Sequence, residues 1–473
     1  MTTPLLERHS LPPFSRIKPS HADPAVRSLI ERNKKSIEAL LAATDDYHWE
    51  NLLSPIEDME DELDQAWSSI SHLNSVCNSN AWRDAYNACL PLLSGYRTWR
   101  DQHEVLCRAY QHIADRAGVA SLDAARRRAV EDGLRDFRLA GVFLPPAQKK
   151  RYAEVRSRLS QLASKFGENV LDATNAWSKE VTREQLDGLP ESALANARQA
   201  AEQRGRPGYL INLEYPSCMP VLTYCHDREL RREVYTAYCT RASDQGPHAG
   251  NWDNSGIIDE TLALRHELAQ LLGFDNYAEF SLATKMAEST AQVMAFLRQL
   301  AEQSRPLGEK EWGALTAFAR NRDALDYLEA WDVNYYSELL KQERYQVSQE
   351  EIRPYLPVNR VLPGLFEVAR RLYGIEVTEL REFDSYHDSV QLFEIRREGE
   401  LIAMFYLDLY SRGNKRGGAW MNDCQVRRRH GDRIQIPVAW LVCNFTPPVG
   451  NAPALLTHTE LITLFHEFGH GLH

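Results

Sequence analysis

The sequence predicts a mainly α-helical protein with one small β-sheet directly before its last helix. Three observations predict this class. Apolar residues recur at steps of three and four along most of the 473 residues, as on the buried face of a helix. Runs with strand character become frequent only from Val390 onward. A helix-start signal then precedes the C-terminal stretch.

The clearest predicted helix covers residues 148–174. One face of this segment carries apolar side chains at steps of three and four, while its charged side chains lie mostly elsewhere. The apolar positions are Tyr152, Val155, Leu159, Leu162, Phe166 and Val170. The same periodicity predicts helices over residues 90–113 and 257–273.

Segments rich in proline, glycine and polar residues divide the chain into three predicted regions. LAGVFLPPAQ (139–148) separates a first helical block from a second, and the polar loop 242–256 ends the second block. We therefore expect an N-terminal helical domain (1–145), a helical connecting region (146–250) and a third region (251–473). YLINL (209–213) is a short predicted strand within the connecting region.

The third region contains the predicted sheet. VQLFEI and LIAMFYLDLY, joined by the polar turn RREGE, are typical of a hairpin, and VAWLVCNFT (438–446) is a third predicted strand. Thr457 followed by Glu460 fits a capping box before the apolar run LITLF, which predicts the start of the last helix. The small sheet is therefore expected beside this helix.

Composition and charge exclude several classes of protein. Lys and Arg total 55 and Asp and Glu total 66, and this net charge of −11 argues against nucleic acid or an anionic membrane as the main partner. The N-terminus lacks the pattern of a secretory signal, and no run of about 18 apolar residues predicts a membrane span. The eight cysteines are scattered without a C-x-x-C pair, as is typical of reduced thiols in the cytosol.

The last ten residues, LFHEFGHGLH, contain the spacing H-E-x-x-H in His466, Glu467 and His470. On a helix the two histidines lie about 40° apart on one face and one turn apart, so both imidazoles can bind one cation. Glu467 lies on the adjacent edge, where its carboxylate can take a proton from a water that the cation has made acidic. The motif indicates a metal-dependent hydrolase.

The motif alone leaves a second interpretation open. H-E-x-x-H arises by chance in a chain with 15 histidines with a probability on the order of a few per cent. The pair would then lie on a half-buried helix face beside a solvated glutamate. The preceding helix start and strand favour the metal site, as do Gly469 and Gly471, which disfavour a helix by about 1 kcal/mol each but allow close approach of a neighbour.

His473 is a further candidate ligand, because seven residues return to the same helical face. It lies about 10 Å from His466 along a straight helix axis. Metal–nitrogen bonds near 2 Å leave almost no freedom for one ion to reach both. We therefore expect His473 to pack against a neighbour or to support the site.

The extended motif FHEFGHGLH resembles the zinc signature of the thimet oligopeptidase family of metallopeptidases, peptidase family M3. LPPFSRIKPSH and TRASDQGPHAGNWDNS are similar to its bacterial oligopeptidase A branch. The resemblance runs over the whole chain. Further stretches that carry it are LALRHELAQLLGFDNYAEFSLATKMAE, WDVNYYSELLKQERY, GLFEVARRLYGIEV and FYLDLYSRGNKRGGAWMNDC.

The resemblance implies a mostly helical, two-lobed zincin-type fold with a deep, narrow channel for short peptides. It implies one Zn²⁺ bound by His466, His470 and a glutamate on a following helix, beyond residue 473, with Glu467 as the general base. The groups that stabilise the oxyanion also fall beyond residue 473. We therefore expect residues 251–473 to be the N-terminal portion of a metallopeptidase catalytic domain, in a C-terminally truncated chain that is inactive by itself.

The expected function is hydrolysis of internal peptide bonds in short oligopeptides, including the breakdown of peptide fragments in the cytosol. We expect a monomer that binds short peptides and neither nucleic acid nor membrane. Two alternatives stay open. One is a helical zinc carboxypeptidase or dipeptidase with the same motif, and the other is an inactive peptide-binding or scaffold fragment.

Segments near the motif carry further predictions. VAWLVCNFT is either an edge strand above the zinc, which would bind peptide by strand addition, or an ordinary core strand. SRGNKRGGAW lacks the order of a phosphate-binding loop and is expected to be a structural turn, with Asp408 and Tyr410 in structural hydrogen bonds. VRRRHGDR (426–433) is expected to be a solvated loop. Cys443 has no evident base partner, which argues against a cysteine peptidase.

Overall fold

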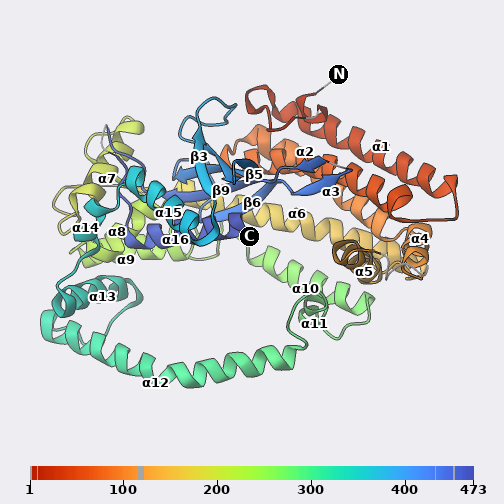
Figure 1. The fold of residues 1–473 in the computed structure, drawn as a ribbon. Helices are drawn as coiled ribbons and strands as arrows, with labels where there is room; N and C mark the ends of the chain where they lie inside the picture. Colours follow the sequence, from red (N-terminus) through yellow and green to blue (C-terminus); the bar gives the residue numbers. More distant parts are fainter. Residues whose placement is uncertain (1–2, 8, 116–121, 432, 451–452) are drawn as a thin grey trace. The chain divides into compact units, whose positions relative to one another are not determined.

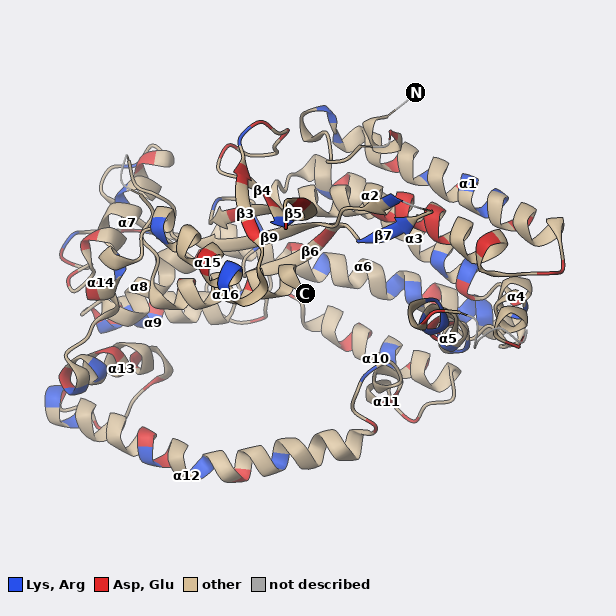
Figure 2. Ribbon diagram, viewed as in Figure 1, with Lys and Arg blue, Asp and Glu red and all other residues tan. Residues whose placement is uncertain are grey.

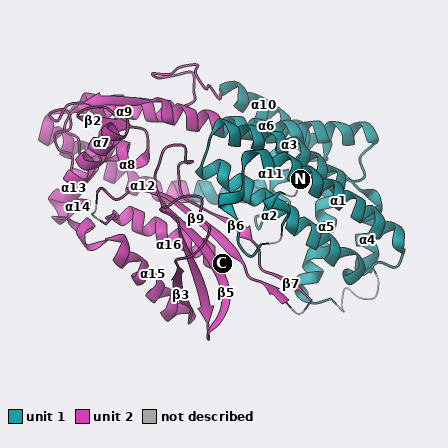
Figure 3. Cartoon of the chain, turned by 90° about the horizontal axis from the view of Figure 1, so that it is seen from above, with its two compact units in different colours: residues 1–167, 255–299 teal, residues 168–254, 300–473 magenta. Residues whose placement is uncertain are grey.

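The computed structural model describes residues 3–7, 9–115, 122–431, 433–450 and 453–473, and it confirms the mainly helical class (Figure 1). The chain divides into two compact units, each built from two separate stretches (Figure 3). The first unit comprises residues 1–167 and 255–299, and the second comprises residues 168–254 and 300–473. The division expected at residues 145 and 250 stays a prediction.

The first unit is built from helices and contains no strand among its described residues. Helix α1 packs against α2 and α3, and α4 packs against α5, around buried apolar side chains. Two bidentate ion pairs, Arg151–Glu267 and Arg158–Glu260, join α6 to α10. The helices are α1 (Ala22–Ala43), α2 (Ser54–Val76), α3 (Asn80–Asp101), α4 (Glu104–Asp115), α5 (Ala124–Leu139), α10 (Ser255–Leu271) and α11 (Tyr277–Leu282). Shorter helical turns lie at Pro4–Leu6, Phe14–Arg16, Pro19–His21 and Trp49–Leu53.

The predicted helix 148–174 is confirmed as part of α6 (Pro146–Ala176), which passes from the first unit into the second. Tyr152, Val155 and Leu162 on its apolar face are buried. The helix predicted over residues 90–113 is instead two helices, because α3 ends at Asp101 and α4 begins at Glu104. The apolar spacing continues across this break and therefore does not reveal it.

The second unit combines helices with the small sheet. Strand β1 (Ser178–Val181) pairs antiparallel with β2 (Tyr209–Asn212), which confirms the strand predicted at YLINL. Residues 242–254 form the predicted polar loop and its turns, and residues 255 and 256 already belong to α10. The helices are α7 (Glu191–Gln203), α8 (Tyr215–Tyr224), α9 (Arg228–Cys239), α12 (Thr290–Asp323, which begins in the first unit), α13 (Ala330–Tyr345), α14 (Gln349–Ile352), a 3-10 turn (Arg353–Tyr355), α15 (Val358–Tyr373) and α16 (His458–Leu472).

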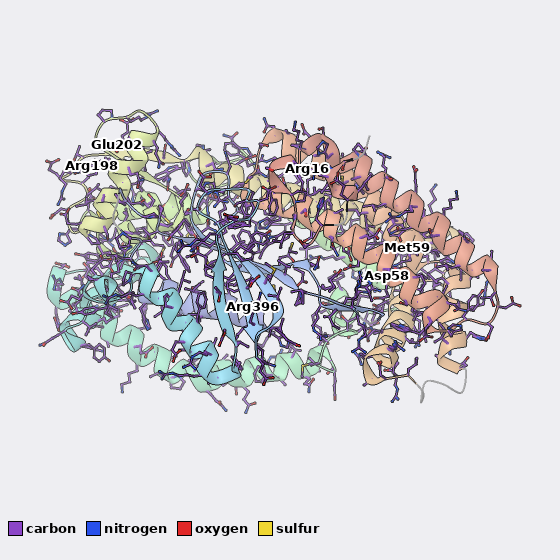
Figure 4. All side chains as sticks on the ribbon, turned by 45° about the horizontal axis from the view of Figure 1, so that its top comes forward. Arg16, Asp58, Met59, Arg198, Glu202 and Arg396 are labelled. Carbon is purple, nitrogen blue, oxygen red and sulfur yellow. The ribbon has the colours of Figure 1, made fainter. Side chains whose placement is uncertain are left out.

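The main sheet has five strands in the order β3-β4-β5-β9-β6. The predicted hairpin is confirmed as β4 and β5. Arg396 on β4 (labelled in Figure 4) forms an ion pair with Glu394 of the same strand. β9 runs parallel to β5 and antiparallel to β6. The strands are β3 (Glu376–Leu380), β4 (Gln391–Arg397), β5 (Glu400–Tyr410), β6 (Trp420–Gln425) and β9 (Val438–Phe445).

VAWLVCNFT is therefore an inner strand, and the interpretation of this segment as an edge strand was wrong. β9 lies between β5 and β6, and Trp440, Leu441, Val442 and Cys443 are all buried. A continuous apolar run is typical of a strand covered on both faces. The edge of the sheet on this side is β6, which lies in the stretch AWMNDC.

The prediction of a solvated loop at 426–433 was also wrong in part. Strand β7 (Arg428–His430) pairs antiparallel with β8 (Arg433–Gln435) as a separate small hairpin, while Asp432 lies outside the described residues. Elsewhere acidic and basic side chains are interspersed, as along α12 (Figure 2). None of the described helices is long and apolar enough to cross a membrane.

Candidate metal centre

Helix α16 carries the H-E-x-x-H motif and begins with the predicted capping box. Thr457 accepts a hydrogen bond from the backbone of Glu460, and the Glu460 carboxylate accepts one from the backbone N–H of Thr457. The other Glu460 oxygen accepts from the backbone N–H and the hydroxyl of Thr446, just after β9, at 2.9 and 3.2 Å. One buried carboxylate therefore fixes the start of α16 to the end of β9.

The segment that leads into α16 is held from a second direction. Arg353 donates two hydrogen bonds to the carbonyl of Leu455, at 3.1 and 3.2 Å. The backbone of Leu456 donates to the carbonyl of Leu356, and that of Val358 donates to the carbonyl of Ala454. The residues directly before the helix are thus paired with the 3-10 turn and the start of α15.

One face of α16 packs on the sheet. Leu464 and Phe468 are buried in the core that includes β5, β9 and α15, and the Phe468 ring lies 5.6 Å from that of Phe405. α16 contacts both β9 and the edge strand β6. Apolar side chains four residues apart lie on the same side of a helix, so burying these two fixes the direction of the motif side chains.

The two glycines of the motif have different surroundings. A Cβ atom on Gly471 would lie 3.0 Å from a methyl carbon of Leu441 on β9, so close approach of a neighbour explains this glycine. No heavy atom of a described residue lies within 4 Å of the corresponding position on Gly469. The explanation expected for both glycines therefore holds for Gly471 only.

The imidazoles of His466 and His470 face one another on the exposed side of α16. Their Nε2 atoms lie 3.0 Å apart, and their rings are nearly perpendicular. Two nitrogens at about 2.0–2.1 Å from one zinc ion at a tetrahedral angle would lie about 3.3 Å apart. The pair therefore fits two ligands of one zinc ion.

Glu467 lies between the two histidines in sequence, and its side chain is buried. No described residue donates a hydrogen bond to its carboxylate, in contrast to that of Glu460, two turns earlier on α16. A carboxylate that is not committed to a structural hydrogen bond is free to interact with a water molecule at the site. Its place on the helix edge beside the histidines agrees with the expectation from the spacing.

No third metal-binding donor is grouped with the two histidines within the described ranges. No set of three His, Cys, Asp or Glu side chains there could hold a metal ion together. His473 is exposed and forms the C-cap of α16, where its backbone N–H donates to Gly469. The residues present thus fit two-thirds of the protein ligand set of a zinc enzyme.

Comparisons with known proteins identify the family. The model of Peptidase family M3 matches residues 221–473, and that of the Neurolysin/Thimet oligopeptidase N-terminal domain matches residues 26–149. Oligopeptidase A of Escherichia coli is 53% identical over 477 residues, which cover 100% of this chain and 70% of the relative. The chain belongs to peptidase family M3. The expected resemblance is confirmed.

Other similar proteins carry names other than oligopeptidase A. A dipeptidyl carboxypeptidase of E. coli is 32% identical over 360 residues, covering 74% of this chain and 51% of that protein. A solved structure of a Bacillus anthracis protein, assigned as an oligoendopeptidase F, has a TM-score of 0.53 at 14% identity. It covers 93% of this chain and 64% of the other, and it supports the fold.

A buried charge cluster lies at the end of β5 in the five-stranded sheet of this M3 chain. Arg412 and Lys415 both pair with the carboxylate of Asp408 on β5, and Tyr386 donates a further hydrogen bond to it. Burial alone would raise the pKa of Asp408, but the hydrogen bonds from Arg412 and the charge of Lys415 hold it below its usual value. The expected structural hydrogen bonding is confirmed for Asp408, whereas Tyr410 accepts a bond from Lys415 through its backbone carbonyl.

The sequence reasoning missed the role of Lys415 in this cluster. SRGNKRGGAW was expected to be a turn, which it is, but its lysine side chain is buried. A single lysine among glycines and arginines gives no local signal of burial, because lysines are mostly exposed. Cys443 is buried too, and burial raises the pKa of its thiol, as expected for a thiol that is not a nucleophile.

Proposed function

We propose that this M3 chain forms the larger part of a zinc-dependent endopeptidase that hydrolyses internal bonds of short oligopeptides. The observation that carries the proposal is the pair of facing Nε2 atoms, 3.0 Å apart, next to a buried carboxylate to which no described residue donates a hydrogen bond. The 53% identity to an oligopeptidase A supports the substrate class. Breakdown of peptide fragments is the proposed role.

Three side chains on α16 have separate proposed roles in the reaction. Zinc, when bound, acts as a Lewis acid that polarises a carbonyl oxygen and lowers the pKa of a water. His466 and His470 bind through neutral ring nitrogens. Glu467 accepts the proton of the attacking water and then delivers it to the leaving amine.

The third zinc ligand is proposed to be a glutamate from sequence beyond residue 473. Two observations support its position: two histidines without a third donor in the described part of the chain, and a chain that spans 70% of its E. coli relative. The choice of glutamate rests on the resemblance of the motif to the zinc signature of family M3. The oxyanion-stabilising groups are proposed to lie there as well.

Peptide binding is proposed at β6 and not at β9. β6 is one of the two edge strands of the sheet, and it is the one that contacts the motif helix among the described elements. An extended peptide adds to such an edge through backbone hydrogen bonds. We therefore propose that a peptide adds to β6, the neighbour of β9.

The full-length Glu467→Gln variant tests the mechanism. We expect it to keep zinc and lose nearly all peptidase activity, because an amide cannot take the proton from water. Zinc content and hydrolysis of a quenched fluorescent peptide are measured together. Glu376→Gln, which changes an exposed glutamate on β3, is the matched control. Retained activity in Glu467→Gln would contradict the assignment of Glu467 as the general base.

A second candidate activity is removal of C-terminal dipeptides. The 32% identity to a dipeptidyl carboxypeptidase favours testing it, although the identity to oligopeptidase A is higher. Peptides blocked at the C-terminus separate the two activities. An endopeptidase cleaves blocked and free peptides alike, whereas exclusive release of dipeptides from free C-termini would overturn the endopeptidase proposal.

The cytosol is the proposed location, with a monomer as the proposed state. A relative named "Probable cytosolic oligopeptidase A" from Arabidopsis thaliana is 36% identical over 488 residues. All eight cysteines are free thiols. The net charge of −11 supports peptides as partners over nucleic acid and anionic membranes.

A further inference from the structure

The parallel pairing of β5 and β9 is interrupted near the motif helix. Asp408 pairs with Val442 and Tyr410 pairs with Phe445, so two steps on β5 correspond to three on β9. Such a bulge removes backbone groups from the regular ladder. Buried carbonyls at this point need other donors.

Lys415 supplies these donors from the loop that follows β5. Its Nζ lies 2.6 Å from the carbonyl oxygen of Cys443, 2.8 Å from that of Tyr410 and 2.9 Å from Oδ1 of Asp408. The side chain is fully buried, and its ammonium pairs with the carboxylate of Asp408, which it shares with Arg412. The lysine thus ties the two strand ends to the middle of the loop between Ser411 and Ala419.

Asn444 lies on the bulge, and its side chain binds the second half of the same loop. Its Nδ2 donates to the carbonyls of Arg416 and Gly418, at 2.9 and 2.6 Å. Backbone pairing between β6 and β9 ends at Trp420 and Val442. The side-chain amide therefore continues the connection where the ladder stops.

The loop also fixes the first residue of β6. The Arg416 guanidinium lies 4.2 Å from the centroid of the Trp420 ring, a cation–π contact. Gly418 has a φ of +91°, a conformation that side chains disfavour, and it turns the chain into the strand. Lys415 and Asn444 act on the residues directly before the edge strand.

We propose that Lys415 and Asn444 are positioning residues for peptide binding at β6. Strand addition requires the N–H and C=O groups of the edge to match those of the peptide, and the two side chains set where that edge begins. They touch neither the peptide nor the metal ligands. The inference rests on the proposed function and names residues that set its substrate affinity.

The full-length variants Lys415→Met and Asn444→Asp test the proposal. Each removes hydrogen-bond donors while keeping much of the side-chain size. We expect KM for an oligopeptide to rise about 3- to 10-fold, the effect of one or two lost hydrogen bonds, with kcat and zinc content close to those of the parent. If Lys415→Met does not fold, Asn444→Asp alone still tests the proposal.

Two control variants in the same unit remove equivalent interactions elsewhere. Arg231→Met breaks the buried pair with Asp332, which keeps Arg228 as a partner just as Asp408 keeps Arg412. Asn196→Asp removes an amide donor to the carbonyl of Pro216. Both should lower thermal stability as much as their counterparts and leave KM unchanged.

The outcomes separate the two proposals. Unchanged KM in both Lys415→Met and Asn444→Asp, or an equal rise in the controls, would overturn the positioning role. Loss of zinc and of kcat in these variants would also contradict it, because the cluster would then act on α16. Full activity of Glu467→Gln, measured in parallel, would instead contradict the peptidase mechanism and leave this comparison of KM values intact.

Discussion

At the scale of the residue, two glutamates of α16 show how surroundings assign a role. Glu460 and Glu467 are both buried, but Glu460 accepts three hydrogen bonds whereas Glu467 accepts none from a described residue. The first carboxylate is committed to structure, and the second is available for chemistry. The capping box predicted the structural role of Glu460, which is confirmed, whereas the general-base role that H-E-x-x-H indicates for Glu467 stays a prediction.

The two glutamates should respond oppositely to substitution. Glu460→Ala should lower the free energy of unfolding by about 1–3 kcal/mol, because it leaves the donors at Thr446 and Thr457 without a partner. Glu467→Gln should leave stability unchanged or raise it, because it removes a buried charge that lacks a partner. Denaturant unfolding of both variants checks this, and a large loss of stability in Glu467→Gln would mean that its carboxylate has a structural partner.

Lys415 gives a pH dependence of known sign. Burial lowers the pKa of Lys415 to about 8, although Asp408 acts in the opposite direction. An unfolded lysine has a pKa of about 10.4. Between about pH 8 and 10 the folded protein has released this proton while the unfolded chain still holds it, so this group makes stability rise with pH. Below pH 8 both states hold the proton, and the cost of burying the charge is present in full.

Lys415→Met should remove this rise. The slope of unfolding free energy against pH should fall by up to about 1.4 kcal/mol per pH unit between pH 8 and 10, relative to the parent. Urea unfolding at a series of pH values measures both slopes. Parallel curves for the parent and the variant would show that the buried lysine does not titrate in this range.

At the scale of the element, the sequence predicted where individual helices and strands lie better than it predicted which strands pair with one another. The hairpin β4–β5, strand β9 and the start of α16 each follow from local periodicity and capping. The inner place of β9 depends on which strands pair with it, and three other strands separate it in sequence from its partner β5. Pairing between distant segments leaves no mark within one segment, so the sequence left both the edge and the core interpretation of VAWLVCNFT open.

The glycines of α16 provide a test at this scale. Gly469→Ala should stabilise the protein by about 0.5–1 kcal/mol, because alanine favours a helix and no described atom is near its Cβ position. Gly471→Ala should gain less or destabilise, because its Cβ would press on Leu441. Thermal unfolding of the two variants gives the comparison, and a loss of stability in Gly469→Ala would indicate a close neighbour from outside the described residues.

At the scale of the whole molecule, the family could be recognised from the sequence, but the site could be derived only in part. His466, Glu467 and His470 lie within five residues, so helix geometry alone brings them together. A third ligand on another helix depends on tertiary packing, and no local spacing predicts it. The buried Lys415 cluster was missed for the same reason, since its partners come from two strands and a loop.

The ligand count predicts a difference in metal affinity. The 473-residue chain should lose zinc on dialysis and show no peptidase activity, because two histidines bind zinc weakly. The protein extended to the length of its relatives should keep about one zinc per chain. Metal analysis and peptide hydrolysis on both forms check this. Stoichiometric, tightly held zinc in the shorter chain would mean that its third ligand lies within these 473 residues.

The bulge of β9 has a consequence for how this sequence can change during evolution. Lys415 reaches the carbonyls of Tyr410 and Cys443 only because four residues separate it from Tyr410, the last residue of β5. One inserted or deleted residue in the loop 411–419 would move the ammonium group off both oxygens and leave them buried without a donor. Relatives should therefore vary the residues of this loop but conserve its length, while polar connections such as 242–256 tolerate insertions and deletions.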